Sequence, residues 1–93
     1  MIKKYEVKYT NEYKRNLKLM HKQGKNINLL NYVINELANG HRLDAKYNDH
    51  KLQGKYKDCR ECHIEPDWLL IYKIEHNTLI LTLTNTGTHS DLY

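Results

Sequence analysis

The chain has 93 residues, 15 Lys and Arg, 11 Asp and Glu, and a net charge of +4, with 40% hydrophobic and 28% charged residues. This composition excludes an intrinsically disordered protein, and the length excludes two domains because independent units need about 50 to 200 residues, so we expect residues 1–93 to form a single domain. No apolar run reaches the roughly 18 to 20 residues of a membrane span, and the first residues do not resemble a signal peptide, which predicts a cytoplasmic protein without membrane contact.

Three residue counts are informative. The two cysteines are too few for a disulfide framework, in agreement with a reducing compartment. The chain has eight Tyr and no Phe, so most of its aromatic rings carry a hydroxyl group that needs a partner or solvent. It also has six His, the side chain best suited to transfer protons near neutral pH, which is a reason to look for acid-base chemistry.

The N-terminal part of the sequence predicts a strand followed by a helix. Apolar and charged side chains alternate over residues 5–9, a period of two that is typical of a half-buried strand. Thr10 or Asn11 then provides a side-chain oxygen that can cap a helix, and Gly24 ends it. One face of this helix is apolar and the opposite face is strongly positive.

A second amphipathic helix and a long loop follow. The helix begins near Asn26 or Asn28 and is ended by the pair Asn39-Gly40, so the two helices form a hairpin. Apolar periodicity then disappears over residues 41–57, which predicts a long loop with at most a short strand around Leu52.

The C-terminal part predicts three strands, over residues 59–65, 68–75 and 78–84, with a short tail at 90–93. Residues 69–72 are apolar on both faces, which indicates a central position in the sheet. The order of elements predicts an α+β fold in which the helices cover one face of a small twisted sheet. The other face is expected to remain free.

Polar residues suited to chemistry lie near the ends of these strands: His50, His63, Asp67 and His89. Because the ends of neighbouring antiparallel strands and their loops converge at one edge of a sheet, we expect these side chains to meet. Ile64 and His63 lie on opposite faces of their strand, so His63 projects to the free face if Ile64 faces the helices.

Three sequence blocks stand in order along the chain: DHKLQGK at 49–55, RECHIEPDWLLIY at 60–72 and TGTHSDLY at 86–93. Together they resemble the YafQ family of bacterial toxins, within the RelE superfamily, and the resemblance covers nearly the whole chain. It implies a RelE-like fold, with an N-terminal strand and a two-helix hairpin on a mostly antiparallel sheet. It also implies a ribosome-dependent endoribonuclease that cuts messenger RNA in the A site and is neutralised by an antitoxin.

Carried over position by position, the resemblance implies catalytic and substrate-binding residues. The family's active site matches His50, His63, Asp67 and His89, with Trp68 lining it and a C-terminal aromatic matched by Tyr93. One position departs: where well-known members carry an arginine two residues before the Gly of the TGTH block, this chain has Asn85. Asn85 remains a predicted substrate-binding residue at this position, but it offers no fixed charge to a phosphate. Arg60 or a nearby Lys is therefore the candidate substitute for the charge.

The chemistry of RNA cleavage suits these residue types. Attack by the 2′-hydroxyl needs a base, an acid for the leaving 5′-oxygen and a stabilising group at the phosphate, and it needs no metal or other cofactor. We assign His50 as the base, His89 as the acid, His63 as the stabiliser and Asp67 as the carboxylate that orients a histidine. The sequence leaves the assignment between base and acid open.

Other surfaces admit two interpretations. The basic face of the first helix either contacts ribosomal RNA phosphates or only keeps the protein soluble, and it consists of Lys14, Arg15, Lys18 and Lys22. Trp68 either stacks on an RNA base that is splayed out of its stack or is a core residue. Tyr93 either stacks on such a base or is simply a frayed chain end.

The remaining histidines and the cysteines are expected to have no catalytic or metal-binding role. His21, His41 and His76 are predicted to be surface residues. Cys59 and Cys62 lie on opposite faces of a strand, and the chain has no second cysteine pair, which argues against a zinc site.

Two functions of other classes remain open besides the ribosome-dependent ribonuclease. One is a catalytically weak module that docks an antitoxin and modulates repression of their shared promoter. The other is a general RNA-binding domain that acts away from ribosomes. For the toxin we expect an acidic antitoxin, partly disordered when free, in a hetero-oligomeric complex, together with the 70S ribosome and messenger RNA as partners.

Overall fold

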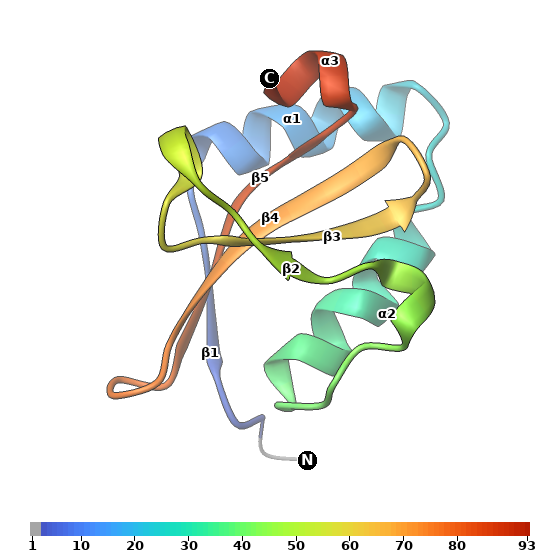
Figure 1. Cartoon of the computed structure of the whole chain (residues 1–93). Coiled ribbons are helices and arrows are strands. Elements are labelled where there is room, and N and C mark those ends of the chain that lie inside the picture. Colours follow the sequence, from blue (N-terminus) through green and yellow to red (C-terminus); the bar gives the residue numbers. More distant parts are fainter. Residues whose placement is uncertain (1–2) are drawn as a thin grey trace.

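The computed structural model describes residues 3–93, and Figure 1 shows the arrangement of its elements. The five strands are β1 (Glu6–Tyr9), β2 (His50–Lys51), β3 (Arg60–Glu65), β4 (Trp68–Glu75) and β5 (Ile80–Gly87). The helices are α1 (Asn11–Lys22), α2 (Ile27–Ala38) and α3 (His89–Leu92), with short 3-10 turns η1 (Ala45–Tyr47) and η2 (Gly54–Tyr56).

The strands form one sheet in the order β1-β5-β4-β3-β2. β1 runs parallel to β5, and the other neighbours are antiparallel. β4 lies in the middle of the sheet, as its run of apolar residues on both faces predicted. The α+β class and the mostly antiparallel sheet are confirmed.

Both long helices begin where side-chain caps were expected. The Thr10 hydroxyl accepts a hydrogen bond from the backbone N–H of Tyr13 at 3.0 Å, and the Asn26 side chain accepts one from Leu29 at 3.3 Å. Such caps satisfy backbone donors that have no partner within the helix. Gly24 follows the end of α1 and has φ +77°, a backbone conformation that glycine adopts without steric cost.

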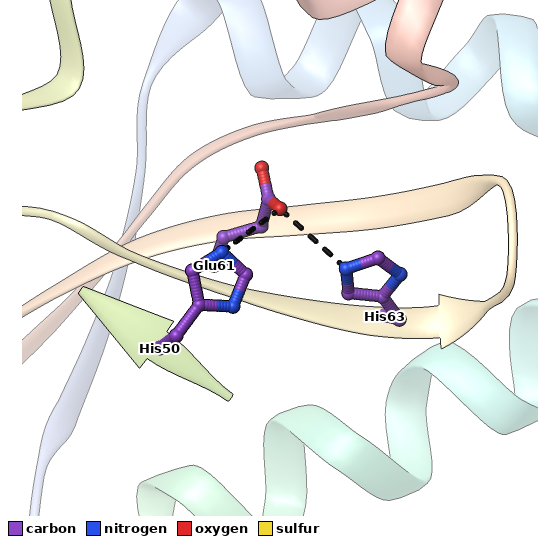
Figure 2. A group of neighbouring side chains, drawn as sticks. All are labelled: His50, Glu61 and His63. Atoms are coloured by element: carbon purple, nitrogen blue, oxygen red, sulfur yellow. Dashed lines mark ion pairs between the residues drawn. The ribbon is translucent and has the colours of Figure 1, made fainter. Parts of the chain in front are cut away.

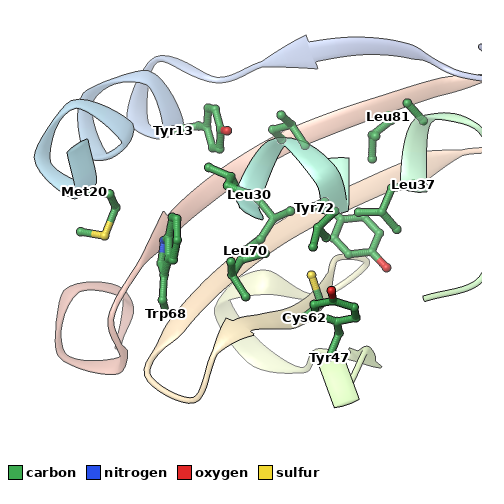
Figure 3. Close-up of a cluster of buried hydrophobic side chains, with 14 of the residues drawn as sticks. Tyr13, Met20, Leu30, Leu37, Tyr47, Cys62, Trp68, Leu70, Tyr72 and Leu81 are labelled. Carbon is green, nitrogen blue, oxygen red and sulfur yellow. The ribbon is translucent and has the colours of Figure 1, made fainter. Parts of the chain in front are cut away.

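The main core lies between the helices and one face of the sheet (Figure 3). Tyr13 and Met20 from α1 and Leu30 from α2 are fully enclosed against Leu70 and Tyr72 of β4. This packing fixes which side of each strand faces the helices, and therefore which side chains project from the opposite face.

The opposite face is partly covered, which corrects the expectation of a free face. Tyr56 and Leu92 pack on Leu69 and Ile71 there, and form a second, smaller apolar cluster. The loop brings Tyr56 into place through η2, and residues 41–57 carry no apolar periodicity from which this could be predicted. The polar half of the face, along β2 and β3, stays accessible.

The structure also corrects several boundaries. β3 begins at Arg60, and β5 runs over Ile80–Gly87 where the sequence predicted 78–84. The short strand in the loop is His50–Lys51, just before Leu52.

The predicted tail forms α3 because it carries a capping box. The Thr88 hydroxyl accepts from the Asp91 N–H, and the Asp91 carboxylate accepts from the Thr88 N–H at 3.0 Å. Among residues 3–93, no helix has the length and apolar character needed to cross a bilayer.

Candidate functional site

Three imidazole rings form a row on the accessible part of the second face. The ring centroids of His50 and His63 are 6.1 Å apart, and those of His63 and His89 are 5.8 Å apart. His50 comes from β2, His63 from β3 and His89 from the first position of α3. The structure therefore brings together residues separated by up to 39 positions, as the topology of the sheet suggested.

His63 projects to this face because of strand parity. Ile64 and Cys62 point into the main core, so His63 and Glu61 point the other way. The sequence argument from alternation is confirmed at this position.

Glu61 is a site residue that the sequence reasoning missed. Its Oε1 lies 3.4 Å from His50 Nε2 and 3.6 Å from His63 Nε2. Figure 2 marks both ion pairs with dashed lines. Glu61 is only 4% exposed, so its carboxylate is withdrawn from water at the floor of the cluster. Its alternation with His63 was visible in the sequence, but the pairing of His50 with Glu61 across β2 and β3 depends on a register that no pattern revealed.

The backbone fixes the orientation of two of the rings. His50 Nδ1 lies 2.7 Å from the carbonyl oxygen of Asn48, and His63 Nδ1 lies 3.3 Å from that of Pro66. A carbonyl oxygen only accepts, so each Nδ1 carries the hydrogen. Both Nε2 atoms are consequently presented to Glu61 and to the open face.

The third ring is held by a carboxylate. Asp67 Oδ1 accepts from the backbone N–H of His89 at 3.0 Å and lies 2.6 Å from His89 Nδ1. Both contacts lower the pKa of Asp67, and the backbone hydrogen bond has the larger effect. The positive charge of Lys25 lowers this pKa further. Asp67 therefore stays ionised beside His89 and leaves the ring's Nε2 for other partners.

Tyr93 adjoins the cluster. Its hydroxyl donates to Glu61 Oε2 at 2.5 Å, and its ring meets Tyr56 edge to face with centroids 5.9 Å apart. Desolvation and the bond to Glu61 raise the pKa of Tyr93. The residue is still 63% exposed, so an accessible aromatic residue borders the site.

Trp68 does not line this site, which corrects that prediction. It is fully buried in the main core, and its indole N–H donates to the Thr86 hydroxyl at 3.0 Å. That hydroxyl in turn donates to the Leu69 carbonyl at 2.8 Å. Of its two interpretations, the core residue is the correct one.

Asn85 is also unavailable to a substrate, since it is 1% exposed. Its Nδ2 donates to Glu12 Oε1 at 2.6 Å and to the Tyr56 hydroxyl at 3.3 Å, while its Oδ1 accepts from Asn16 at 2.6 Å. The predicted substrate contact is therefore wrong, because every polar atom of this amide is engaged within the protein.

Arg60, the proposed substitute for the missing arginine, points away from the cluster. It shares the strand face of Cys62, and its Nε donates to Asp49 Oδ1 at 3.1 Å. Tyr72 donates to the same oxygen at 2.7 Å. The placement of Arg60 at the phosphate is corrected accordingly.

The remaining predicted positions are surface residues. Lys14, Arg15, Lys18 and Lys22 are exposed on α1. His21, His41 and His76 are exposed as well, and His41 pairs with Glu36.

Cys62 is buried in the main core and Cys59 packs on the second cluster, so the two do not share a metal site. A different set could hold an ion: ligand atoms of His50, Glu61 and His63 all lie within 4.8 Å of one another.

Comparison with known proteins finds one family model and similar bacterial toxins. The family model for YafQ, bacterial toxin of a type II toxin-antitoxin system, matches residues 5–93. The mRNA interferase toxin YafQ of Escherichia coli strain K12 is 40% identical over 89 residues, which are 95% of each chain.

Solved structures are similar over the same extent. The E. coli DinJ-YafQ toxin-antitoxin complex contains a chain that is 40% identical with a TM-score of 0.88, covering 97% of this chain and 98% of that one. A metal-bound toxin from Helicobacter pylori is 38% identical with a TM-score of 0.90, covering 96% and 99%. Because the family model and the E. coli K12 relative both match almost its whole length, the chain belongs to the YafQ family of bacterial toxins of type II toxin-antitoxin systems.

Proposed function

We propose that this protein is an mRNA interferase, an endoribonuclease that cuts messenger RNA in the ribosomal A site. The observation that carries the proposal is the row of three imidazoles with two carboxylates on an accessible face. Its relative in E. coli is named an mRNA interferase toxin. We place the activity in the cytoplasm, where ribosomes and messenger RNA meet.

The proposed reaction needs only this chain's own side chains. His50 Nε2 takes the proton of the 2′-hydroxyl, the O2′–P bond forms, and the P–O5′ bond breaks as His89 Nε2 protonates the leaving oxygen. Asp67 supports His89 as the acid, because an ionised carboxylate at Nδ1 stabilises the imidazolium that donates the proton. We therefore assign His50 as base and His89 as acid.

His63 lies between the other two rings, where the scissile phosphate would sit. Its Nε2 can donate to a phosphate oxygen when protonated, with Glu61 supporting the charge. Tyr93 offers an exposed ring on which an unstacked base can rest. Glu61 acts through its neighbours as a positioning residue.

The direct test compares RNA cleavage by the purified protein with and without 70S ribosomes. We expect new 5′ ends in messenger RNA when ribosomes carry it, and little cleavage of the same RNA alone. Equal binding or cleavage of free RNA would instead support the general RNA-binding domain. Absence of cleavage under both conditions would contradict the proposal that the protein is an endoribonuclease.

A second candidate is the weak binding module, and one observation favours it. Asn85 is a buried neutral amide and Arg60 lies on the other face of its strand, so neither brings a cation to the phosphate. The same cleavage assay separates the two candidates, because the binding module leaves ribosome-bound messenger RNA intact while still binding its antitoxin.

An acidic antitoxin is the proposed partner, in a hetero-oligomeric complex. The net charge of +4 favours an acidic protein electrostatically. The relative in E. coli forms a complex with the antitoxin DinJ.

The basic face of α1 supports docking on ribosomal RNA. We expect that replacing its four cations by Gln weakens binding to 70S particles and flattens the dependence of binding on salt, because fewer counterions are released. The measurement is co-sedimentation at several salt concentrations for the variant of Lys14, Arg15, Lys18 and Lys22.

The matched control removes the same charge from other exposed lysines: Lys3, Lys8, Lys55 and Lys57. An equal loss of binding in both variants would show that only net charge matters, and would refute a specific role for α1.

A further inference from the structure

We propose that Asp49 is a positioning residue for His50: its carboxylate holds the segment before β2 against the sheet and thereby fixes where the imidazole lies. The effect on catalysis rests on the proposed function, in which His50 is the base, whereas the effect on the ring itself does not. Asp49 directly precedes His50 in the chain, and the proposed reaction assigns no step to its carboxylate.

His50 lies on a strand that is too short to hold it firmly by backbone pairing. β2 spans His50–Lys51 at the edge of the sheet (Figure 1) and pairs with β3 over these two residues. One more backbone bond follows, from the Leu52 N–H to the Cys59 carbonyl at 3.0 Å. Even a complete two-stranded pairing is marginal in water, so a side-chain contact that holds β2 has a large effect on its position.

The carboxylate of Asp49 provides such a contact. Its Oδ1 accepts from Arg60 Nε at 3.1 Å and from the Tyr72 hydroxyl at 2.7 Å. Arg60 belongs to β3 and Tyr72 to β4, so one oxygen atom joins the segment before β2 to two neighbouring strands. Because the contact to Arg60 is charge-assisted, it is about twice as strong as a hydrogen bond between neutral groups.

This contact is largely shielded from water. Tyr72 is fully buried in the main core, and the side chains of Arg60 and Asp49 are 35% and 24% exposed. Burial first, and then the bond to Asp49, raises the pKa of Tyr72, so its hydroxyl keeps its proton and remains a donor. Removing the carboxylate leaves both donors without this acceptor, which costs more here than at an exposed site.

The turn before β2 connects the contact to the ring. Asn48 has φ +46° and ψ +50°, a left-handed conformation that Asn adopts more readily than most residues. Its carbonyl oxygen accepts from His50 Nδ1 on the accessible side of the sheet, while the carboxylate of Asp49 bonds to β3 and β4 on the core side. A shift of Asp49 therefore also moves the carbonyl group that orients the ring.

The first test follows the imidazole nitrogens of the full chain by NMR, because their chemical shifts report which ring atom carries the hydrogen. In the wild type we expect the hydrogen on Nδ1 in both His50 and His63, as their carbonyl partners require. Asp49→Ala should lose this preference at His50 and keep it at His63. Tyr72→Phe removes one of the two bonds but keeps the ring in the core, and it should shift the His50 signals in the same direction.

Glu6→Ala is the matched control, since Glu6 is a carboxylate paired with Lys8 on β1, at the opposite edge of the sheet. It should leave the signals of both rings unchanged. Circular dichroism establishes which variants are folded, and Tyr72→Phe decides the question if Asp49→Ala is not. Unchanged His50 signals in the folded variants, or an equal change at His63, would overturn the positioning role.

The second test measures single-turnover cleavage of messenger RNA on 70S ribosomes. Asp49→Ala should be about 10²-fold slower than the wild type, the loss expected when a reacting group is displaced by about 1 Å. Its binding to 70S particles should equal that of Glu6→Ala, which carries the same change of charge. A cleavage rate equal to that of Glu6→Ala would refute the effect on catalysis. If the wild type cleaves nothing, the proposed function fails while NMR still decides whether Asp49 positions His50.

Discussion

Replacing His89 by Ala is expected to lower the rate of ribosome-dependent cleavage by about 10²- to 10⁴-fold, the usual contribution of a general acid. The variant loses the proton donor for the 5′-oxygen and leaves Asp67 without its ring partner. The backbone N–H of residue 89 still reaches Asp67, so α3 should keep its place. The measurement is the single-turnover rate on messenger RNA bound to 70S ribosomes.

A growth assay provides a second readout. Expressed without antitoxin, the wild type should arrest growth and produce new messenger 5′ ends, while His89→Ala should relieve both. His41→Ala is the matched control, since His41 is an exposed histidine paired with Glu36 away from the cluster. Arrest that persists in His89→Ala would remove His89 from the mechanism.

Replacing Trp68 by Ala is expected to lower the free energy of unfolding by about 3 to 5 kcal/mol, as removal of a fully buried large aromatic side chain does. The change leaves a cavity beside Met20 and Leu70 in the main core and deprives the Thr86 hydroxyl of its indole donor. Because small domains are only marginally stable, much of the chain should be unfolded at 37 °C. Urea denaturation followed by circular dichroism measures the effect.

The control is Tyr32→Ala, which removes an aromatic ring at a residue that is 53% exposed and should change the free energy of unfolding by less than about 0.5 kcal/mol. This pair also separates the two interpretations of Trp68. A Trp68→Ala protein with wild-type stability and lost RNA cleavage would indicate a stacking role, and would contradict the position seen in the core.

Local patterns predicted most of the fold. The Thr10 and Asn26 caps, the stop at Gly24 and the central position of residues 69–72 all follow from short-range rules, and the structure agrees with each. The predictions were wrong where a contact between residues far apart in the sequence determines the structure. Tyr56 covers the second face only because η2 folds back on it, and nothing near it in the sequence encodes that contact.

The candidate site was predicted unevenly for the same reason. His50, His63, Asp67 and His89 converge as expected from strand ends, although their roles stay predictions until tested. Glu61 was missed because its partners come from another strand and from the C-terminus. Trp68 and Asn85 were misplaced because residue type alone does not tell a buried polar network from a binding surface.

The amide of Asn85 links α1 to the part of the sheet that precedes the imidazole cluster. Through Glu12 and Asn16 it fastens α1 to β5, just before the segment that leads to His89. Side-chain hydrogen bonds thus join the helix with the basic face to the strand that leads to His89, the proposed proton donor. If α1 docks on ribosomal RNA as proposed, we expect this link to help position His89 as well.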